Sequence, residues 1–585
     1  MSSKHFINDP THLVLSALHS ITLTNPTTAL DRTNKILYLR PDAQPSPQVS
    51  LISGGGSGHE PSFAAFVGPG ALSAAVAGTI FASPNADQVR RCILERVQAD
   101  RGVLVVVMNY TGDVLNFGMA VEKAKAAGLR VEMLVMGDDA GVGRSQGGKV
   151  GRRGIAGTVL VHKIAGALAA KGAELEEVYA VAKLVAENTV SIGSSLSHVH
   201  VPGREAGEEE ELKKDEVEIG MGIHNEPGSE KSTADLKGLV KTMLKYMLDQ
   251  SDKDRGFLEV KSSDETVLLI NNLGGVSVLE MGGITTEVVE QVSKDYGIKP
   301  VRIIAGTFMT SLNGLGFSLS ILKLQDTGSK HSLLDLLDAP AECTGWSAAI
   351  KSSTWTKPPT QTLDEGHGAG IENKPCGLQI DPQLADKALK HALEKLIAAE
   401  PEVTKYDTVV GDGDCGTGLK RGAEGILEKL GSDKQADAAL YLDAITSVVE
   451  DRMDGTSGAI YAIFLNALAH GLRTQASSSS QKQADAKVWA AALHDALQAM
   501  SRYTPAKPGD RTLVDALAPF VEELGRSGDV RKAAAAADEG AKKTKGMKAS
   551  LGRTVYVGGS GFEEVPDPGA HGLAVFLKGL AEGLE

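Results

Sequence analysis

Short runs of β-branched and other apolar residues recur through the first 345 residues and alternate with segments of helical spacing. Each run is too short for a helix and rich in valine or isoleucine, which is typical of buried strands. Segments 86–98 and 116–127 have the pattern of helices. The alternation predicts an α/β domain over residues 1–345, and we expect two α/β subdomains with mostly parallel sheets. The predicted strands are 49–52, 103–108, 131–136, 266–270 and 301–305.

The hydrophobic period changes in the C-terminal part of the chain. Apolar residues between 384 and 397 recur every four positions, which predicts an amphipathic helix. Residues 354–375, between the two patterns, are rich in proline, glycine and threonine and lack an apolar period. We therefore predict a linker over 346–380 and an all-α domain over 381–585. Further helical patterns occupy 438–449, 488–500 and 513–524.

Composition and charge exclude several classes of protein. Hydrophobic residues make up 42% and charged residues 23% of the chain, so a disordered or fibrous protein does not fit. The formal net charge of −14 repels phosphate backbones and anionic membranes, so we expect neither nucleic acid nor membrane as a partner. The four cysteines lack CxxC spacing. Asp9 and Pro10 stand where a signal peptide needs an unbroken apolar stretch. We expect a cytoplasmic protein.

A glycine-rich loop follows the first predicted strand. Residues 53–61 read SGGGSGHEP. Glycines let a ligand approach the backbone closely, and His59 at the exit of the loop has a side chain suited to acid or base chemistry near neutral pH. Phosphates and polyols both fit such a loop. An ordinary strand-to-helix turn with a structural histidine is an equal alternative, because the spacing matches neither the Walker nor the dinucleotide-binding motif.

A second polar segment lies at the carboxyl end of the predicted strand 103–108. Residues 109–116 read NYTGDVLN. Because ligands of open α/β sheets bind outside the carboxyl ends of strands, Asp113 and His59 are candidates for an acid/base pair. The alternative, given even weight, is that Asp113 caps the following helix.

Three further histidines stand in glycine-containing or proline-containing segments. Residues 220–228 read GMGIHNEPG, and a nitrogen of His224 could hydrogen-bond a ligand or attack a reactive carbonyl. A purely structural histidine is the commoner case. His198 and His200 have the spacing that places two rings on one face of a strand, yet no third metal ligand is evident, so we favour a structural role.

Three aspartates in the helical half form the strongest local signal. Asp407, Asp412 and Asp414 lie in YDTVVGDGDCGTG, between two predicted helices. Carboxylates gathered in one loop repel one another unless a cation binds them, and oxygen ligands favour Mg²⁺ or Ca²⁺. An EF-hand is excluded because position twelve, counted from Asp412, is Ala423 instead of glutamate. We therefore predict a Mg²⁺ site.

The residues after these aspartates favour a phosphate ligand. Residues 415–418 open the next helix, whose N–H groups and positive dipole end attract anions. Residues 455–458, GTSG, repeat the arrangement, although an ordinary Ser/Thr cap is about as good an interpretation. Arg553 in LGRTVYVG and Asp567 in PDPGA add a cation and a turn. Together these features predict a nucleoside triphosphate site without a Walker motif.

Seven motifs in chain order together resemble the ATP-dependent dihydroxyacetone kinases of the eukaryotic single-chain type, relatives of triokinase/FMN cyclase. They are SGGGSGHEP, NYTGDVLNF, GIHNEPG, GDGDCGTG, DGTSGA, PGDRTLVDAL and DPGA. The resemblance implies an N-terminal domain that binds the triose. It also implies a C-terminal, antiparallel eight-helix barrel that binds ATP.

The resemblance also implies roles for individual residues. His224 would form a hemiaminal with the ketone carbon of dihydroxyacetone, while His59 and Asp113 would orient and deprotonate the attacking hydroxyl, with Asp113 as the base. The substrate's oxygens would be held by Gly56, Ser57 and Gly58. Mg²⁺ would be bound by Asp407, Asp412 and Asp414. The nucleotide would contact Cys415, Gly416, Thr417, Gly418, Thr456, Ser457, Gly509, Arg553, Asp567, Pro568 and Gly569.

Two positions depart from the family pattern. Met108 stands where family members often carry lysine, directly before NYTGD, which removes that lysine's contact with the substrate. Asp454 changes the family's GGTSG to DGTSG.

The function that the resemblance implies is transfer of the γ-phosphoryl group of ATP to dihydroxyacetone, and also to glyceraldehyde. Because donor and acceptor sites would lie on separate domains, we expect a homodimer in which they close on one another. One alternative is the splitting of FAD to a cyclic flavin phosphate and AMP at the same nucleotide site. The other is a non-catalytic protein that senses trioses.

Overall fold

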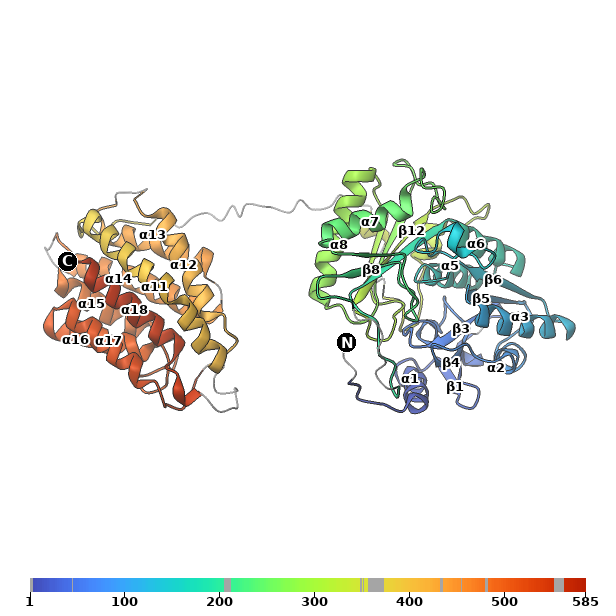
Figure 1. Cartoon of the computed structure of the whole chain (residues 1–585), viewed down its shortest axis with the longest axis horizontal. Coiled ribbons are helices and arrows are strands. Elements are labelled where there is room, and N and C mark those ends of the chain that lie inside the picture. The colour runs from blue at the N-terminus through green and yellow to red at the C-terminus, as the bar shows by residue number, and fades with distance from the viewer. Residues whose placement is uncertain are drawn as a thin grey trace. The chain divides into compact units, whose positions relative to one another are not determined.

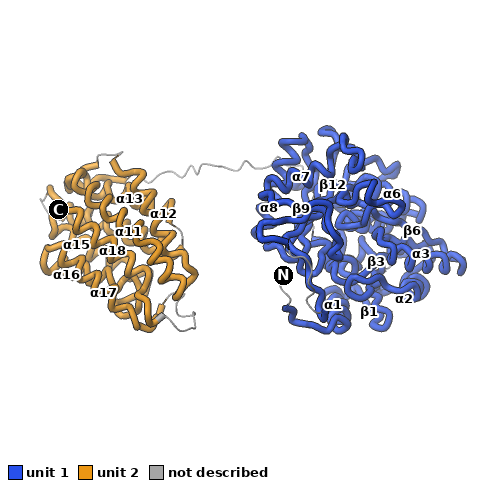
Figure 2. The backbone as a smooth tube through the Cα atoms, viewed as in Figure 1, with its two compact units in different colours: residues 1–361 blue, residues 362–585 orange. Residues whose placement is uncertain are grey.

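The computed structural model describes residues 4–44, 46–204, 212–347, 350, 352–355, 373–431, 435–453, 455–478, 482–551 and 562–585. The chain forms two compact units, residues 1–361 and 362–585 (Figure 2). The first unit contains two six-stranded sheets with helices, and the second is helical (Figure 1). No helix of the described residues combines the length and the apolar character needed to cross a membrane.

The first sheet has the strand order β1-β2-β4-β3-β5-β6. Strands β4, β3, β5 and β6 are parallel, as the sequence predicts, whereas β1 and β2 form an antiparallel edge. The strands are β1 (Thr28–Asp31), β2 (Ile36–Leu39), β3 (Ser50–Ser57), β4 (Ala74–Ile80), β5 (Val103–Met108) and β6 (Val131–Met136).

Helices cover both faces of this sheet, which is why β5 is apolar throughout. Val105 packs in one core cluster with Phe117 of α3, and its neighbour Val106 packs in another with Val159 of α5. Successive side chains of a strand point to opposite faces, so a strand buried on both sides has no polar position. The helices are α1 (Pro10–Thr24), α2 (Ala86–Arg91), α3 (Thr111–Ala126), α4 (Arg144–Gly147), α5 (Thr158–Ala170) and α6 (Leu175–Glu187).

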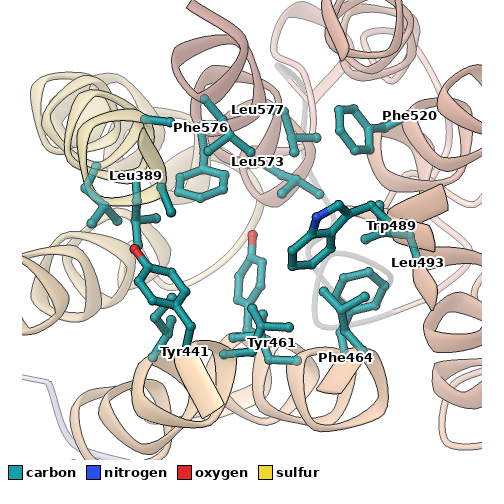
Figure 3. Close-up of a pocket in the computed structure, with 18 of the residues that line it drawn as sticks. Leu389, Tyr441, Tyr461, Phe464, Trp489, Leu493, Phe520, Leu573, Phe576 and Leu577 are labelled. Carbon is teal, nitrogen blue, oxygen red and sulfur yellow. The ribbon is translucent and has the colours of Figure 1, made fainter. Parts of the chain in front are cut away.

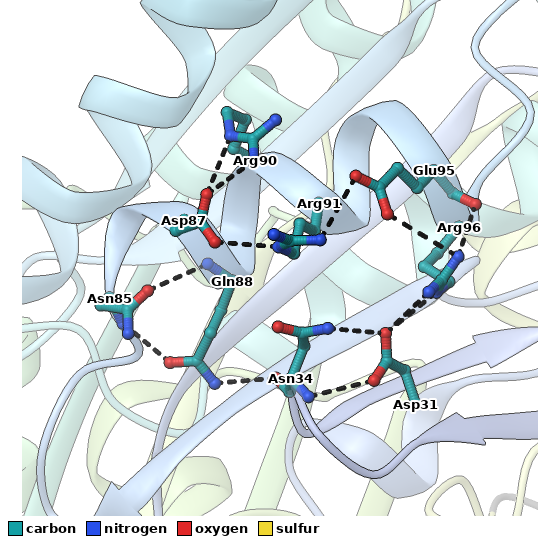
Figure 4. Close-up of polar contacts among 9 residues, drawn as sticks. All are labelled: Asp31, Asn34, Asn85, Asp87, Gln88, Arg90, Arg91, Glu95 and Arg96. Carbon is teal, nitrogen blue, oxygen red and sulfur yellow. Dashed lines mark hydrogen bonds and ion pairs between the residues drawn. The ribbon is translucent and has the colours of Figure 1, made fainter.

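A polar network joins the start of α2 to the turn between β1 and β2 (Figure 4). Asn85 and Gln88 form a capping box at the N-terminus of α2, and the Gln88 amide also donates to the carbonyl of Asn34 at 2.7 Å. Arg96, in the π-turn that continues α2, pairs with Asp31 of β1 at 2.9 Å. These contacts hold the antiparallel edge against the helix layer.

The second sheet has the order β11-β10-β12-β7-β8-β9 and differs from the prediction. Only β10 and β11 are parallel, and the other pairs are antiparallel. Residues 307–315, which connect β11 to β12, contain no crossover helix, and a parallel arrangement needs one. The strands are β7 (Thr189–Ser195), β8 (Val217–Ile219), β9 (Glu230–Ser232), β10 (Thr266–Asn272), β11 (Arg302–Gly306) and β12 (Gly316–Lys323).

The two sheets share one core. Leu269 of β10 and Leu104 of β5 belong to the same apolar cluster, together with α5, whose residues 158–169 are all buried. The outer face of the second sheet packs against α7 (Leu236–Leu248) and α8 (Val278–Tyr296). Short helices α9 (Leu333–Leu337) and α10 (Ser352–Trp355) follow.

The second unit is a closed ring of eight helices, α11 to α18, in its described part. Each helix packs against the next in sequence, and α18 packs against α11 and closes the ring. This arrangement agrees with the expected eight-helix barrel. The helices are α11 (Pro382–Val410), α12 (Cys415–Lys429), α13 (Ala438–Arg452), α14 (Gly455–Ser478), α15 (Ala486–Met500), α16 (Val514–Ser527), α17 (Val530–Lys543) and α18 (Pro568–Gly583).

Aspartates begin many of these helices, and an apolar cavity lies inside the ring. A carboxylate accepts backbone N–H groups at the start of α11, α13, α15, α17 and α18, which satisfies donors that a helix cannot pair internally. The cavity has a volume of about 640 Å³. Tyr461, Phe464, Trp489 and Phe576 are among its lining residues (Figure 3).

Candidate active site

The glycine-rich segment belongs mainly to β3, so the strand-to-helix turn considered for it is wrong. A Cβ at Gly56 would lie 2.7 Å from the backbone nitrogen of Ala82, so the chain passes too close for a side chain. Gly58 has φ +105°, which other residues rarely adopt. Its N–H donates to Glu60 at 2.9 Å, and the Ser57 hydroxyl donates to the carbonyl of Gly78 at 3.1 Å. These glycines allow the strand to pack closely and bring His59 to its position.

His59 follows this strand and is fully buried. Its Nδ1 lies 2.9 Å from the carbonyl oxygen of Thr310, and its Nε2 lies 3.0 Å from the Nε2 of His224. The ring also stacks on Phe81. Burial, and secondly the charge of His224, lower the pKa of His59 to about 3. His59 is therefore neutral at physiological pH, and a neutral imidazole can accept a proton.

His224 lies in the loop between β8 and β9. Glu226 accepts two hydrogen bonds from it, one from Nδ1 at 2.9 Å and one from the backbone N–H at 3.0 Å. The edges of the Phe81 and Tyr110 rings meet the imidazole. The hydroxyl of Ser311 donates to the carbonyl oxygen of Ile223, the residue before His224, at 2.7 Å. The ring is thus fixed from several sides with its Nε2 directed at His59.

Asp113 lies in the first turn of α3 and is only 5% exposed. The N-cap of α3 is Tyr110, which makes no side-chain cap, so the alternative that Asp113 caps this helix is wrong. Within the described residues the Oδ1 of Asp113 has no hydrogen-bond partner. Burial raises the pKa of Asp113, and Ser83 and the charge of His224 partly oppose this rise. An unpartnered buried carboxylate oxygen is suited to accept a proton from a bound hydroxyl.

The sequence interpretation missed two residues of this site. Glu226 stands two positions after His224, but its importance depends on the orientation of the ring. The Tyr110 hydroxyl is buried and has no hydrogen-bond partner in the described part of the chain. Met108 is buried beside Gly154, so the end of β5 offers an apolar group next to this site.

His198 and His200 do not share a metal site in the described residues. They follow β7 in a loop instead of lying on a strand. His198 pairs with Glu218 at 3.2 Å, and His200 contacts His5 at 2.9 Å. The structural role favoured for them is consistent with these contacts.

In the helical unit, Asp407, Asp412 and Asp414 meet at the junction of α11 and α12. One carboxylate oxygen from each lies within 4.8 Å of the others. Asp407 is buried near the C-terminus of α11 and accepts the backbone N–H of Cys415 at 3.0 Å. Gly413 turns the chain with φ +80°. The three carboxylates fit a hard divalent cation such as Mg²⁺.

Several N-termini of helices gather beside these aspartates. Cys415 opens α12, and Ser457 in the first turn of α14 hydrogen-bonds to its thiol. Burial, and then the charges of Asp407 and Asp567, raise the pKa of Cys415 to about 12, so the thiol is protonated at physiological pH. Gly416, Thr417, Gly418 and Thr456 lie in the same two first turns.

Asp567 caps α18 by accepting the N–H of Ala570 at 2.8 Å. Burial, together with the charges of Asp515 and Asp407, raises its pKa to about 7. The N–H of Gly509 donates to Asp515 at 2.5 Å, and Arg511 donates to the carbonyl of Val565 at 2.9 Å, so the loop containing Gly509 lies beside Asp567. Pro568 and Gly569 begin α18. Arg553 and Asp454 lie outside the described residues.

These observations fit a nucleotide with its metal. Three N-termini of helices, those of α12, α14 and α18, supply oriented N–H groups that would suit phosphate oxygens. The aspartates would supply oxygen ligands for a cation, which would neutralise phosphate charge. The structure thus contains a histidine pair with a buried carboxylate in one unit. The other unit contains three helix N-termini and three neighbouring carboxylates, groups that suit an anion and a cation.

Comparison with known proteins gives the family. Residues 19–345 match the Dak1 domain, and residues 409–582 match the DAK2 domain. The chain is 43% identical to a dihydroxyacetone kinase of Pichia angusta over 100% of this chain and 98% of that one. It is 36% identical to human triokinase/FMN cyclase, over 100% of both chains. The chain therefore belongs to the dihydroxyacetone kinase family, as the sequence motifs predict.

A solved structure supports the same family. The dihydroxyacetone kinase of C. freundii in complex with AMP-PNP and Mg²⁺ matches with a TM-score of 0.64 and 31% identity. The match covers 99% of this chain and 100% of that one.

Proposed function

We propose that this protein is an ATP-dependent kinase that transfers the γ-phosphoryl group of ATP to dihydroxyacetone, and also to glyceraldehyde. The observation that carries the proposal is the histidine pair, His59 and His224, beside the unpartnered carboxylate oxygen of Asp113. Full-length similarity to dihydroxyacetone kinases supports it.

The α/β unit would bind the triose. The Nε2 of His224 would bond to the ketone carbon, which selects carbonyl compounds over glycerol. Asp113 would take the proton of the hydroxyl that attacks phosphorus. Burial raises the pKa of Asp113, and a carboxylate with a higher pKa is a stronger base. His59, Gly56, Ser57 and Gly58 would line the triose site.

The helical unit would bind ATP with Mg²⁺. Asp407, Asp412 and Asp414 would hold the cation, whose bound form neutralises charge on the phosphates. The first turns of α12, α14 and α18 would bind phosphate oxygens. The nucleotide positions in them are Cys415, Gly416, Thr417, Gly418, Thr456, Ser457, Asp567, Pro568 and Gly569, with Gly509 and Arg553 as further contacts.

A coupled assay for ADP tests the proposal. ADP should form with dihydroxyacetone or glyceraldehyde, and not with glycerol or without a triose. Formation of ADP that is independent of the triose contradicts the kinase function.

FAD splitting is a second candidate activity, because human triokinase/FMN cyclase is similar over the full chain. Incubation with FAD and Mn²⁺ should then give AMP and a cyclic flavin phosphate. A protein that binds dihydroxyacetone but forms neither ADP nor AMP would instead be a triose sensor. The presence of all three aspartates favours catalysis.

A further inference from the structure

Glu226 contacts the histidine pair, but no chemical role has been assigned to it so far. One oxygen of its carboxylate accepts from the Nδ1 of His224 at 2.9 Å, and the other accepts the backbone N–H of the same residue at 3.0 Å. The N–H of Gly222 donates to the carbonyl of Glu226 at 2.9 Å and closes the turn. A Cβ at Gly222 would lie 1.9 Å from the Glu226 carboxylate and 2.5 Å from the Arg153 guanidinium, so a larger residue there would displace these side chains. The carboxylate and the ring are therefore held as one rigid piece.

The hydrogen bonds determine where the protons of the histidine pair lie. The carbonyl of Thr310 can only accept, so the Nδ1 of His59 carries a hydrogen. The carboxylate of Glu226 likewise requires a hydrogen on the Nδ1 of His224. Only the Nε2 atoms remain, and they lie 3.0 Å apart. This distance requires one proton between them, because two facing lone pairs repel.

That proton gives one ring a positive charge, and Glu226 balances it. His224 touches the carboxylate and is 19% exposed, whereas His59 is fully buried, so the charge resides on His224. Burial would raise the pKa of Glu226, but the hydrogen bond and charge of His224 lower it to about 2. The set of His59, His224 and Glu226 is therefore neutral as a whole.

The other charged groups around the histidine pair do not balance the charge of His224. Asp113 on α3 has no hydrogen bond from either ring, and Tyr110 before α3 meets His224 with its ring edge. Asp139, after β6, is paired with Arg153 at 2.8 Å. Among the described residues Glu226 is the carboxylate bonded to the imidazole of His224.

We propose that Glu226 is a positioning residue that fixes the Nδ1–H tautomer of His224 and balances the charge of its adduct with a ketone. The inference rests on the proposed triose kinase function. The proton moves to the Nε2 of His59, which frees the lone pair of His224. The lone pair on the Nε2 of His224 attacks the ketone carbon and forms the N–C bond. The π electrons of the C=O group move to its oxygen, and that oxygen takes the proton from His59. The substituted ring keeps its Nδ1 hydrogen and positive charge, opposite Glu226.

Replacing Glu226 by glutamine tests the proposal. The amide keeps the size of the side chain but can donate as well as accept, so the opposite tautomer, with Nε2–H, becomes available. Loss of a charge-assisted hydrogen bond should raise the KM for dihydroxyacetone about 10- to 100-fold. The kcat at saturating triose and the affinity for ATP should change less.

Two spectroscopic readouts report on the chemistry directly. The ketone signal of [2-¹³C]dihydroxyacetone should shift to the tetrahedral range with the wild type and much less with Glu226→Gln. The ¹⁵N shifts of His224 should show Nδ1–H in the wild type and mixed tautomers in the variant. Glu226→Asp keeps the charge and should restore part of the adduct signal.

Glu218→Gln is the matched control, because Glu218 is a buried carboxylate that pairs with His198 and accepts the N–H of Gly228 but makes no hydrogen bond to His224. It should leave the adduct signal and the KM unchanged. The inference is overturned if Glu226→Gln has the adduct signal and the KM of the wild type. It is also overturned if Glu226→Gln and Glu218→Gln lose the adduct signal equally and both have a lowered melting temperature. A wild type that phosphorylates triose without any adduct overturns the inference alone. A wild type that forms no triose phosphate overturns the proposed function itself.

Discussion

Asp113 is buried in the first turn of α3, and one of its oxygens makes no hydrogen bond within the described residues. Asp113→Asn keeps the shape of the side chain but cannot take up a proton. We expect kcat to fall about 10²- to 10⁴-fold, the usual contribution of a general base. Calorimetry should find ATP affinity unchanged, because the nucleotide residues belong to the other unit. Turnover at the wild-type rate would remove Asp113 from the role of base.

His224 is the expected anchor of the triose. His224→Ala removes the nucleophile, so dihydroxyacetone would bind through hydrogen bonds alone. We expect its KM to rise by about one to two orders of magnitude, since a covalent bond and its orientation are lost. Steady-state kinetics with both trioses measure this effect. A KM equal to that of the wild type would contradict covalent anchoring.

His162 on α5 gives a prediction about stability and pH. It is fully buried between Phe63 and Phe66, and neither ring nitrogen has a hydrogen-bond partner in the described chain. Burial lowers its pKa to about 3. Between pH 6.5 and pH 3 the unfolded chain binds this proton and the folded chain does not, so the stability falls as the pH falls. At pH 5 the loss is about 2 kcal/mol relative to neutral pH.

His162→Leu should remove this dependence. Urea unfolding at pH 5 and pH 7 measures it as the difference between the two free energies of unfolding, which is independent of any packing change common to both. The control is His19→Leu on the exposed side of α1, which should keep the wild-type difference. An unchanged difference in His162→Leu would mean that the buried ring contributes nothing to acid sensitivity.

At the level of single residues, the sequence predicted which side chains could carry chemistry better than it predicted which residues contact one another. His59, Asp113 and His224 stand out because glycines or strand ends surround them. Glu226 does not, because a glutamate before proline is an ordinary turn residue until the His224 ring is seen to bond to it. Contacts between residues far apart in sequence, such as Thr310 with His59, leave no local pattern.

The junction of α11 and α12 brings the three aspartates proposed as metal ligands together through secondary structure. Asp407 is fixed by the last turn of α11, while Asp412 and Asp414 follow in the loop. Asp412→Asn should weaken Mg²⁺-dependent ATP binding at least about tenfold, because a charged ligand of a hard cation is lost. Calorimetry with ATP, with and without Mg²⁺, measures the effect. Asp451→Asn on exposed α13 is the control and should bind ATP normally.

Elements with a local signal were predicted well, and elements that depend on distant pairing were not. Strands β5 and β6 have the predicted bounds, because both are short, apolar and bounded by turns. Helix α3 begins at Thr111 instead of 116, since its first turn contains polar residues such as Asp113, which break the apolar helical pattern. The antiparallel order of the second sheet depends on β12 entering between β10 and β7, and no local pattern encodes that choice.

At the scale of the whole molecule, the ordered set of motifs identified the family although no single motif was sufficient. The prediction is confirmed by similarity over the full chain. The change from strand patterns to helical patterns likewise matches an α/β unit and a helical unit. The homodimer and the residue roles remain predictions.

The separation of acceptor and donor residues between two units leads to the last prediction. Phosphoryl transfer requires the bound triose and the γ-phosphate to meet, and we expect them to meet within a homodimer in which each helical unit serves the partner chain. Asp113→Asn and Asp412→Asn chains should each have little activity at an ATP concentration that the Asp412→Asn chain binds poorly. When the two variants are co-expressed, each mixed dimer keeps one acceptor site and one donor site intact, on different chains. Such mixtures should recover about a quarter of the wild-type activity if chains pair at random.

Two differently tagged chains allow the mixed dimer to be isolated and assayed for ADP release. Mixed dimers that stay inactive would show that each chain uses its own two units. A monomeric mass in sedimentation under turnover conditions would contradict the dimer altogether. Recovery in the mixture cannot come from either variant alone, because Asp113 and Asp412 are needed in the same catalytic event. The experiment therefore distinguishes transfer between chains from transfer within one chain.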